Sequence, residues 1–488
     1  MAERRLAAVD LGAGSGRVAV GRFDGARVDL EVVHRFGNRP LWLPDGLHWN
    51  LPQLFADTLA GLAAAAQLAP LHGIGVDAWG CDYALLDESD RMLGLPYHYR
   101  DPARSSAAIV ARAFERVGRR ELYARTGIQT MPINTIFQLV AEAGSAAAAA
   151  AHRIALIPDL IGLWLTGTLA NEVTAASSTG LLEARGLRWA ADLAERLGIP
   201  AGPFGGEAVP PGVELGSVLP GNSAAGDAVG ATVRTVAGHD TASAFAAAAT
   251  AGTGAAVLSS GTWSLLGLEL PEPELGTRAE AFNLTNERGI GGTTRLLRNV
   301  MGMWLIEECR REWGGPTYEE LYRAAESASG DVPLFDPDDE SLLHPGAMTP
   351  RIAALWSEPV ADRATVVRSI LLSLACKYRV VLEQLEVVSA RRIDTVQVVG
   401  GGAHNRLLCQ LTADVTQREV LAGPEEATLL GNVLVQLQAI GELGTIEEMR
   451  ELAAAAVPLT RYEPHDAGGL ATYERFLERT GAAVEEIA

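Results

Sequence analysis

Short apolar runs separated by glycine or charged residues open the chain. The segments LAAVD, VAVGRF and ARVDLEVVHRF follow one another with only short turns between them, a pattern typical of strands joined by tight turns. A helix is predicted within residues 51–68, and GIGVDAWG (73–80) has the pattern of a further buried strand. We therefore expect an antiparallel start to a mixed sheet.

Strand-then-helix units recur further along the chain. Residues 104–200 are predicted to be mainly helical, and VRTVAGHDTASAFAAA (233–248) indicates a strand followed by a helix. A second cycle begins near residue 255 and contains a long helix predicted at 363–388, followed by a strand, a triple-glycine turn and another helix. This order predicts two α/β domains that meet near residues 245–255.

Composition narrows the class of protein. Hydrophobic residues make up 48% of the 488 residues and charged residues 20%, as in globular proteins. The formal charge of −20 disfavours nucleic acid and anionic membranes as partners. Lys377 is the only lysine, so a phosphate-binding loop with a Gly-Lys pair and the protein-kinase lysine motif are both excluded. We expect Lys377 to be a solvated helix residue.

The four cysteines, Cys81, Cys309, Cys376 and Cys409, are widely separated and contain no C-x-x-C pair. This spacing disfavours zinc clusters and redox pairs, so we expect buried, reduced thiols. The first apolar run is too short for a signal peptide, and no apolar stretch approaches the ~18 residues of a membrane-spanning helix. A cytoplasmic location is expected.

Residues 10–17, DLGAGSGR, place a carboxylate at a predicted strand end, followed by glycines at alternate positions. Such a loop can turn tightly and direct backbone N–H groups toward an anion. An ordinary glycine hairpin is the alternative interpretation. A dinucleotide-binding fingerprint is disfavoured, because Arg17 stands where that motif has glycine and because a strand is predicted next.

Two turns in the second half could hold phosphate oxygens. Residues 259–262, Ser-Ser-Gly-Thr, offer hydroxyl and backbone donors, although a plain β-turn is the alternative. Residues 400–402 are three glycines between a predicted strand and helix, so a ligand could lie directly on the backbone; close strand–helix packing is the alternative. Asn405 follows on the helix side.

Polar side chains also stand at predicted strand ends in the first half. His239 and Asp240 lie between a predicted strand and the helix that follows it. Asp240 could have no role other than as the N-cap of that helix. In GVDAWGCD (75–82), Trp79 is either a platform for a sugar ring or a core residue. Asn299 is predicted to head a helix.

Six blocks that occur in one order over nearly the whole chain resemble those of the FGGY carbohydrate kinases. They are DLGAGSGR, GVDAWGCDY, GHDTASA, LSSGTWSLLG, RNVMGMWL and VVGGGAHNRLLCQLTAD. The sequences of the segments HDTASA, SSGTWSL and AGPEEATLLGN are most similar to those of the branch of the family that phosphorylates L-rhamnulose.

The resemblance implies an α/β fold of two actin-like ATPase domains with ribonuclease-H-like cores and an interdomain catalytic cleft. Residues 1–246 would carry the sugar site and phosphate loop, and residues 247–488 the nucleotide site. The implied reaction transfers the γ-phosphoryl group of ATP, with Mg²⁺, to a ketose sugar. By position, Asp240 matches the general base, and Asp10 would bind Mg²⁺ through water. The residues that match sugar contacts are Gly80, His239, Asp240, Thr241 and Asn299. Those that match ATP contacts are Ala13, Gly14, Ser15, Gly16, Arg17, Thr262, Glu307 and Gly401.

Two positions depart from the family pattern. Gly14 stands where the family commonly has serine, which removes a hydroxyl but keeps the backbone cradle. Glu307 stands where a relative contacts ATP through glutamine. A carboxylate there would repel phosphates, although it could accept a hydrogen bond from a ribose hydroxyl.

Other functions stay open at this point. Within the family, the alternatives are a fuculokinase, xylulokinase or glycerol kinase type of enzyme. Outside it, a chaperone-type or filament-type ATPase shares the fold, and an NAD-linked dehydrogenase is weakened by Arg17. Asp240 separates these classes, because only transfer to a hydroxyl requires a base. The sequence leaves open whether the protein is a monomer or a homodimer.

Overall fold

The computed structural model describes residues 3–200, 204, 206–250, 254–328, 331–356, 362–465 and 468–482. Residues 251–253, within the predicted domain boundary, lie outside this set. The chain divides into two compact units, each assembled from separate stretches. Unit 1 comprises Met1–Ala249, Leu270–Arg295 and Ala427–Ala456, and unit 2 comprises Thr250–Glu269, Leu296–Glu426 and Val457–Ala488.

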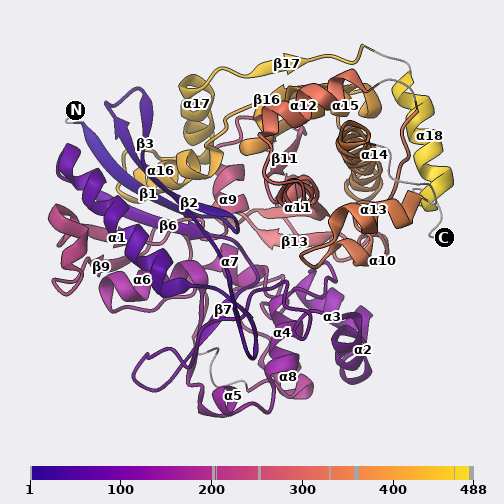
Figure 1. Cartoon of the computed structure of the whole chain (residues 1–488). Helices are drawn as coiled ribbons and strands as arrows, with labels where there is room; N and C mark the ends of the chain where they lie inside the picture. The colour runs from indigo at the N-terminus through magenta and orange to yellow at the C-terminus, as the bar shows by residue number, and fades with distance from the viewer. Residues whose placement is uncertain are drawn as a thin grey trace. The chain divides into compact units, whose positions relative to one another are not determined.

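Unit 1 is built on a six-stranded sheet of order β3-β2-β1-β6-β10-β9 (Figure 1). The pairings β1–β2 and β2–β3 are antiparallel, which confirms the predicted antiparallel start. β6 runs parallel to β1 and β10 parallel to β6, so the sheet is mixed. The strands are β1 (Arg4–Leu11), β2 (Ser15–Phe23), β3 (Val28–Gly37), β6 (Gly73–Ala78), β9 (Glu214–Ser217) and β10 (Thr232–Arg234).

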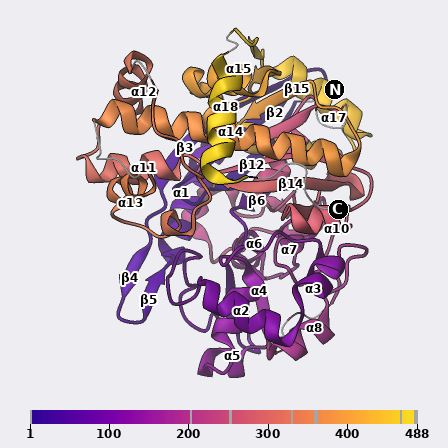
Figure 2. The ribbon, with the colours of Figure 1, turned by 90° about the vertical axis from the view of Figure 1, so that its right-hand side faces the viewer.

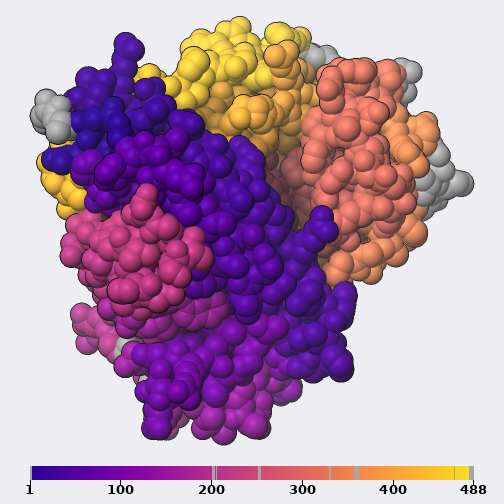
Figure 3. Space-filling model, turned by 60° about the vertical axis from the view of Figure 1, so that its left-hand side comes forward, coloured from indigo at the N-terminus to yellow at the C-terminus, as the bar shows by residue number. Residues whose placement is uncertain are grey.

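Helices cover both faces of this sheet. Gly61 of α1 (Leu51–Leu68) packs so closely that a Cβ would lie 2.4 Å from Val18. Gly21 meets Val433 of α16 (Ala427–Ala439) in the same way, at 2.6 Å. Because Val18 and Gly21 are three positions apart on one strand, they point to opposite faces. The helix α1 also packs against η2 (Ser223–Ala228). In Figure 3 the magenta atoms of that part of the chain lie beside the purple atoms of α1.

The remaining part of unit 1 is mainly helical, as predicted for residues 104–200. Apolar side chains from α2, α4 and α8, among them Ile109, Phe137 and Leu193, form a separate core. Figure 2 shows these helices grouped together. The elements of unit 1 not yet named are β4 (Leu41–Leu43), β5 (Gly46–His48), β7 (Tyr83–Leu86), α2 (Ala107–Arg116), α3 (Arg119–Thr126), α4 (Thr135–Glu142), α5 (Ala146–Ala150), β8 (Arg153–Leu156), α6 (Ile157–Thr166), α7 (Val173–Ser177), α8 (Ala191–Leu197), α9 (Asp240–Ala246), α10 (Thr277–Ala281), β13 (Thr285–Arg288), η3 (Ile290–Gly292) and α17 (Ile446–Ala456).

A second sheet has the order β13-β14-β12-β11-β15-β16-β17. β11 pairs antiparallel with β12 and parallel with β15, so the second cycle begins with two antiparallel strands near residue 255. The long helix predicted at 363–388 is α14 (Arg363–Ser389). The other elements are β11 (Ala256–Ser260), β12 (Trp263–Leu270), β14 (Thr294–Met301), α11 (Trp304–Glu312), α12 (Tyr318–Ser327), η4 (Glu340–Leu342), α13 (Met348–Trp356), β15 (Thr395–Val399), η5 (Gly401–His404), α15 (Arg406–Thr416), β16 (Glu419–Ala422), β17 (Thr460–Tyr462) and α18 (Gly468–Thr480).

Three local predictions need correction. Lys377 is not solvated: it is 5% exposed, because α14 is buried on most sides, and its Nζ lies 2.8 Å from Asp336. Asn299 lies on strand β14 rather than at a helix head, since Gly302 separates that strand from α11. All four cysteines are free, but Cys81 is only partly buried. Among the described residues, no helix is both long and apolar enough to cross a bilayer.

Candidate active site

Three charged side chains line up across neighbouring strands of unit 1. In the strand register, Asp10 of β1 lies opposite Arg17 of β2 and opposite Asp77 of β6. Residues paired in this way project from the same face of the sheet. The Nη2 atom of Arg17 lies 2.7 Å from Oδ2 of Asp10, so this ion pair orients the Asp10 carboxylate, which is only 2% exposed.

Asp77 is a buried carboxyl group in a negative neighbourhood. Burial raises its pKa well above the ordinary value, and the nearby carboxylates of Asp10 and Asp240 raise it further. Asn432 of α16 donates a hydrogen bond of 2.6 Å to Oδ2 of Asp77. Asp10, Asp77 and Asp240 are therefore close enough to influence one another electrostatically, and Asp77 favours its neutral form.

The loop between β1 and β2 is a tight hairpin that contains Ala13 and Gly14 of the predicted phosphate loop, whereas residues 15–17 begin β2. Its ends are joined by a hydrogen bond of 2.9 Å from the Gly12 N–H to the Ser15 carbonyl. Asn38 supports the loop from the side, because its amide donates to the Gly12 carbonyl at 3.0 Å. A Cβ on Gly14 would meet nothing within 4 Å, so this part of the loop can accommodate a ligand on its backbone.

The end of β6 holds a buried polar cluster. The Asp82 carboxylate accepts hydrogen bonds from the indoles of Trp49 and Trp79 and from the Gln138 amide. Burial raises the pKa of Asp82 to about 7, although these donors oppose the rise. Trp79 is 5% exposed and packs against Trp49 with the ring centroids 4.2 Å apart and the planes tilted by 40°, so it is a core residue rather than an open platform for a sugar ring.

The strand-to-helix turn at 238–241 lies directly beside the end of β6. The Ala78 N–H donates to the Gly238 carbonyl at 2.9 Å, and Gly80 packs under His239, whose Nε2 would be 2.7 Å from a Cβ there. The N-cap of α9 is His239, whose Nδ1 lies 3.1 Å from the Thr241 backbone nitrogen. Asp240 is instead the first residue of the helix.

The Asp240 carboxylate is held in its ionised form. Its Oδ1 accepts hydrogen bonds from the backbone N–H and the hydroxyl of Thr241, and lies 3.2 Å from Nδ1 of His239. Burial tends to raise the pKa of Asp240, but the contacts with His239 and Thr241 outweigh it and lower the pKa below the ordinary value. With 29% of its side chain exposed, Asp240 can accept a proton from a bound molecule at neutral pH.

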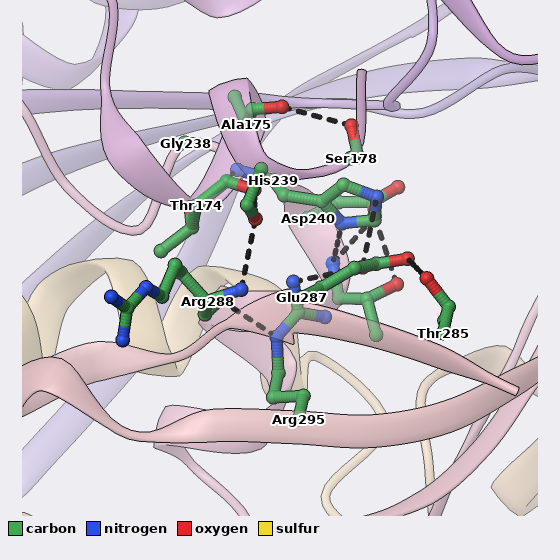
Figure 4. A network of polar contacts seen from close by, with 12 residues as sticks. Thr174, Ala175, Ser178, Gly238, His239, Asp240, Thr285, Glu287, Arg288 and Arg295 are labelled. Carbon is green, nitrogen blue, oxygen red and sulfur yellow. Dashed lines mark hydrogen bonds and ion pairs between the residues drawn. The ribbon is translucent and has the colours of Figure 1, made fainter. Parts of the chain in front are cut away.

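A buried ion pair lies on the other side of the imidazole (Figure 4). The guanidinium of Arg295, which is fully buried, lies 3.0 Å from the Glu287 carboxylate. The same carboxylate is 4.0 Å from Nε2 of His239. The imidazole of His239 therefore lies between the Asp240 carboxylate and the Glu287–Arg295 ion pair.

In unit 2, the predicted ATP-binding turns meet at one edge of the sheet. Ser259 of β11 and Val399 of β15 are parallel partners, so the turns carrying Thr262 and Gly401 follow neighbouring strand ends. A Cβ on Gly402 would lie 2.1 Å from the Ser260 hydroxyl, which shows how closely the two turns pack.

The three glycines of the second turn have different environments. Gly400 has a φ of 80°, a left-handed conformation that favours glycine, and Gly402 packs against β11. Gly401 is exposed, and a Cβ there would meet nothing within 4 Å. Asn405 caps α15 through the Leu408 N–H at 3.0 Å. Gly401 is therefore the member of the triplet whose backbone is open to a ligand.

Glu307 is surrounded by donors. Its carboxylate accepts from Arg310 at 2.7 Å, Arg311 at 3.1 Å and the Tyr318 hydroxyl at 2.7 Å. Burial tends to raise the pKa of Glu307, but Arg310 and Tyr318 lower it below the ordinary value. The two guanidiniums offset the negative charge that would otherwise repel phosphates. Asn299, on β14 of unit 2, is partly buried.

Metal binding by protein groups alone is not indicated in the described ranges, where no cluster of three or more His, Cys, Asp or Glu side chains is arranged for it. Mg²⁺ in phosphoryl-transfer sites needs fewer protein ligands, because one or two carboxylates bind it together with phosphate oxygens and waters. Asp10, at a strand end beside the glycine loop, fits that kind of donor set.

Sequence reasoning missed two buried polar residues of this region. Glu172, 1% exposed, contacts the 238–241 turn, and Asn432 contacts Asp77. The only sequence signal for Asn432 is its amide, and that of Gln436 four residues on, in the otherwise largely apolar run ATLLGNVLVQ. Glu172 precedes Val-Thr at the start of a short helix, which indicates an N-cap but no connection to the site.

Family models match both parts of the chain. Residues 9–245 match the N-terminal domain of the FGGY family of carbohydrate kinases, and residues 256–440 match its C-terminal domain. A protein of Bacteroides thetaiotaomicron named rhamnulokinase is 39% identical over 466 residues, which cover 94% of this chain and 96% of the relative. A rhamnulokinase of Enterococcus faecalis is 39% identical over 490 residues and covers 98% of each chain.

Solved structures with low sequence identity share the fold. A ligand-bound xylulose kinase from Lactobacillus acidophilus has a TM-score of 0.78 at 15% identity, covering 97% of this chain and 96% of that one. Plasmodium falciparum glycerol kinase with ADP has a TM-score of 0.75 at 14% identity, and 98% of each chain is covered. The likeness extends over the whole fold rather than over one unit.

Proposed function

The chain belongs to the FGGY family of carbohydrate kinases, and we propose that it transfers the γ-phosphoryl group of ATP to L-rhamnulose, giving L-rhamnulose 1-phosphate and ADP. The observation that carries the choice of sugar is the identity of 36–39% to proteins named rhamnulokinase along nearly the whole chain. A chaperone-type or filament-type ATPase gains no support from these relatives.

Asp240 is the proposed general base. The lowered pKa keeps its carboxylate ionised at neutral pH, and the part-exposed side chain stands at a helix start, where a hydroxyl can approach it. The proposed sugar-binding residues beside it in unit 1 are Gly80, His239 and Thr241. Asn299 of unit 2 is the remaining proposed sugar contact.

Nucleotide binding is assigned to the turns. The backbone of residues 13–17 is proposed to bind phosphate oxygens, with Thr262, Glu307 and Gly401 as further ATP contacts. Asp10 would hold Mg²⁺ through water, and the bound ion would supply neutralisation of phosphate charge. In domain terms, residues 1–246 would carry the sugar site and phosphate loop, and residues 247–488 the nucleotide site.

The chemical step requires little covalent participation by the protein. The C1 oxygen of the sugar forms a bond to the γ-phosphorus while the bond from that phosphorus to the bridging oxygen of ADP breaks. The hydroxyl proton passes to the Asp240 carboxylate. Orienting the acceptor hydroxyl toward the γ-phosphorus, and keeping water from taking its place, are the tasks left to the sugar-binding residues. Because ATP is the donor, we also propose action in the cytoplasm.

A coupled assay of ADP release across a panel of acceptors tests this function. L-Rhamnulose, L-fuculose, D-xylulose and glycerol are compared at equal concentrations with saturating Mg²⁺ and ATP. We expect kcat/KM for L-rhamnulose to exceed the others by at least about 100-fold, a difference of roughly 2.7 kcal/mol. Phosphorus NMR should identify a 1-phosphate as product. A higher kcat/KM for another acceptor would assign the enzyme to a different branch of the family.

Metal dependence provides a second check. Excess EDTA should abolish ADP release, because no lysine stands in the glycine loops to neutralise the phosphates. Without a sugar acceptor, ADP release should stay near the blank rate. Steady ATP hydrolysis without sugar would favour an ATPase of another class.

A further inference from the structure

A single buried oxygen in unit 1 collects four hydrogen bonds. Oε2 of Glu172 accepts from the Gly238 N–H at 2.9 Å, the Thr174 hydroxyl at 2.6 Å, the Thr174 N–H at 3.0 Å and the Ala175 N–H at 3.2 Å. Three of these donors belong to the first turn of α7, and the fourth lies 66 residues away in the chain. Glu172 therefore ties the start of α7 to the turn before α9.

The tie includes two successive peptide groups. While Glu172 holds the Gly238 N–H, the Thr174 hydroxyl oxygen accepts from the His239 N–H at 3.1 Å. From the opposite side, the Ala78 N–H binds the Gly238 carbonyl. The backbone that leads into Asp240 is thus fixed at three consecutive polar groups. Figure 4 shows Thr174 beside Gly238 and His239.

Glu172 and Gly238 are in close contact. A Cβ on Gly238 would lie 2.9 Å from Oε2 of Glu172, so no side chain fits between the carboxylate and the turn. Burial raises the pKa of Glu172 to about 7, while the donors from Thr174, Gly238 and Ala175 favour its ionised form. In the ionised form the hydrogen bonds are charge-assisted and stronger than bonds between neutral groups.

We propose that Glu172 is a positioning residue for phosphoryl transfer: through Gly238 and Thr174 it holds the backbone that places the Asp240 carboxylate against the acceptor hydroxyl. The inference rests on the proposed function, in which Asp240 is the base. Glu172 itself touches neither substrate in this scheme. Its effect on rate comes from the geometry of the turn, where a displacement of about 1 Å can cost about 100-fold in rate.

Glu172→Gln tests the proposal, because glutamine keeps the shape but loses the charge. We expect kcat to fall about 10- to 100-fold with the KM for ATP changed less than about twofold. The decisive measurement is a double-mutant cycle with Asp240→Asn. If Glu172 acts through Asp240, the double variant should be as slow as Asp240→Asn alone. Losses that multiply in the double variant would overturn the proposal.

The cycle also separates the two levels of inference. If Asp240→Asn keeps near-normal kcat, the assignment of the base is wrong. If Asp240→Asn is slow but Glu172→Gln is not, the base assignment stands and the positioning role is wrong. As a control, Glu142→Gln changes a buried carboxylate of α4, which pairs with Arg104, and it should lower the melting temperature without a comparable loss of kcat.

Thr174 offers a second variant in case Glu172→Gln does not fold. Thr174→Val removes the hydroxyl that links Glu172 to His239 while keeping the shape of the side chain. We expect kcat to fall several-fold and Thr174→Ser, which retains the hydroxyl, to restore it. Equal kcat in the valine and serine variants would count against the positioning role, because packing alone would then explain both.

Discussion

Two buried carboxylates of unit 1, Glu172 and Asp82, have different partners from the buried carboxylate of Asp338 in unit 2, whereas Asp10 and Glu287 of unit 1 pair with arginine. In unit 1, Glu172 and Asp82 are held by peptide, hydroxyl, indole and amide donors, and burial raises the pKa of each to about 7. In unit 2, Asp338 is also buried, but Lys377 and Arg298 lie close enough to lower its pKa against the effect of burial. Neutral donors orient a carboxylate and leave its charge uncancelled, whereas basic partners cancel it.

The turns at 238–241 and 400–402, which are proposed to bind sugar and nucleotide, also differ in the groups that they present. The turn at 238–241 in unit 1 presents a carboxylate and an imidazole. The turn at 400–402 in unit 2 presents bare backbone, with space above Gly401. Acid–base chemistry is therefore expected from the turn at 238–241, and binding of an anionic nucleotide through backbone N–H groups from the turn at 400–402 together with residues 13–17 of unit 1.

The largest effect should come from removing the charge of the unit 1 turn. Asp240→Asn keeps the shape and the acceptor oxygen that caps the Thr241 N–H, so the melting temperature should change little. Loss of a positioned base should lower kcat by ~10²–10⁴, about 3–5 kcal/mol of barrier. Steady-state kinetics with L-rhamnulose measure this.

A matched control comes from Asp87, which makes similar local hydrogen bonds to Ser89 and Arg91 in a surface turn. Asp87→Asn should leave kcat unchanged. Near-normal kcat in Asp240→Asn would reduce Asp240 to a structural residue of the helix start.

In unit 2 the removal of a buried charge should affect stability instead of chemistry. Lys377 lies 2.8 Å from Asp336 and 3.2 Å from Asp338. Lys377→Met would leave these carboxylates without their lysine, at a cost of about 3 kcal/mol, the lower end for a broken buried pair because Asp336 is partly exposed. Thermal melting should show a clear decrease, with kcat of the remaining folded enzyme nearly unchanged.

The exposed pair of Arg392 and Asp394 provides the comparison, since the Arg392 side chain is 85% exposed. Arg392→Met should not change the melting temperature measurably. Equal effects of the two substitutions would show that Lys377 is not a structural charge.

Smaller effects are expected at the turn of residues 400–402. Substitutions of Gly401 and Gly402 there distinguish an effect on ATP binding from an effect on folding. Gly401→Val places a side chain in open space, so the fold should persist while the KM for ATP rises about tenfold, or roughly 1.4 kcal/mol. Gly402→Val would push against the Ser260 hydroxyl and should lower the melting temperature by overpacking. An unchanged KM for ATP in Gly401→Val would remove this turn from the nucleotide site.

The same local patterns explain how much could be predicted from the sequence. Strand, glycine turn and helix follow one another within about ten residues at 238–241 and 400–402, so short-range signals sufficed there. The contacts of Glu172 with Gly238 and of Asn432 with Asp77 span 66 and 355 residues. No local pattern encodes such a partner, because it depends on which strands and helices become neighbours in the fold.

Burial of polar residues was the second source of error. A solvated Lys377 is expected from the amphipathic pattern of SILLSLACKYRVVLEQLEVV, but the middle of α14 is enclosed, and Asp336 and Asp338 from the segment before η4 compensate the charge of the lysine. Asn299 was assigned to a helix because apolar residues follow it; β14 extends to Met301 before the chain turns.

The smallest effect should come from the thiols, which also contrast the two units. Burial raises the pKa values of Cys309, Cys376 and Cys409 in unit 2 to about 12. Cys81 in unit 1 is partly exposed, yet burial and the nearby carboxylates of Asp82, Glu287 and Asp240 raise its pKa well above the ordinary value.

All four thiols should therefore stay protonated and react slowly at pH 7, since the thiolate is the reactive form. Dithiothreitol should change neither kcat nor the melting temperature, because no disulfide involves these cysteines. Iodoacetamide labelling followed by mass spectrometry should show slow reaction at Cys81 first, because the other three are buried, and rapid reaction at all four only after unfolding. Rapid labelling of Cys81 in the native protein would mean that burial and the carboxylates around it do not suppress its ionisation.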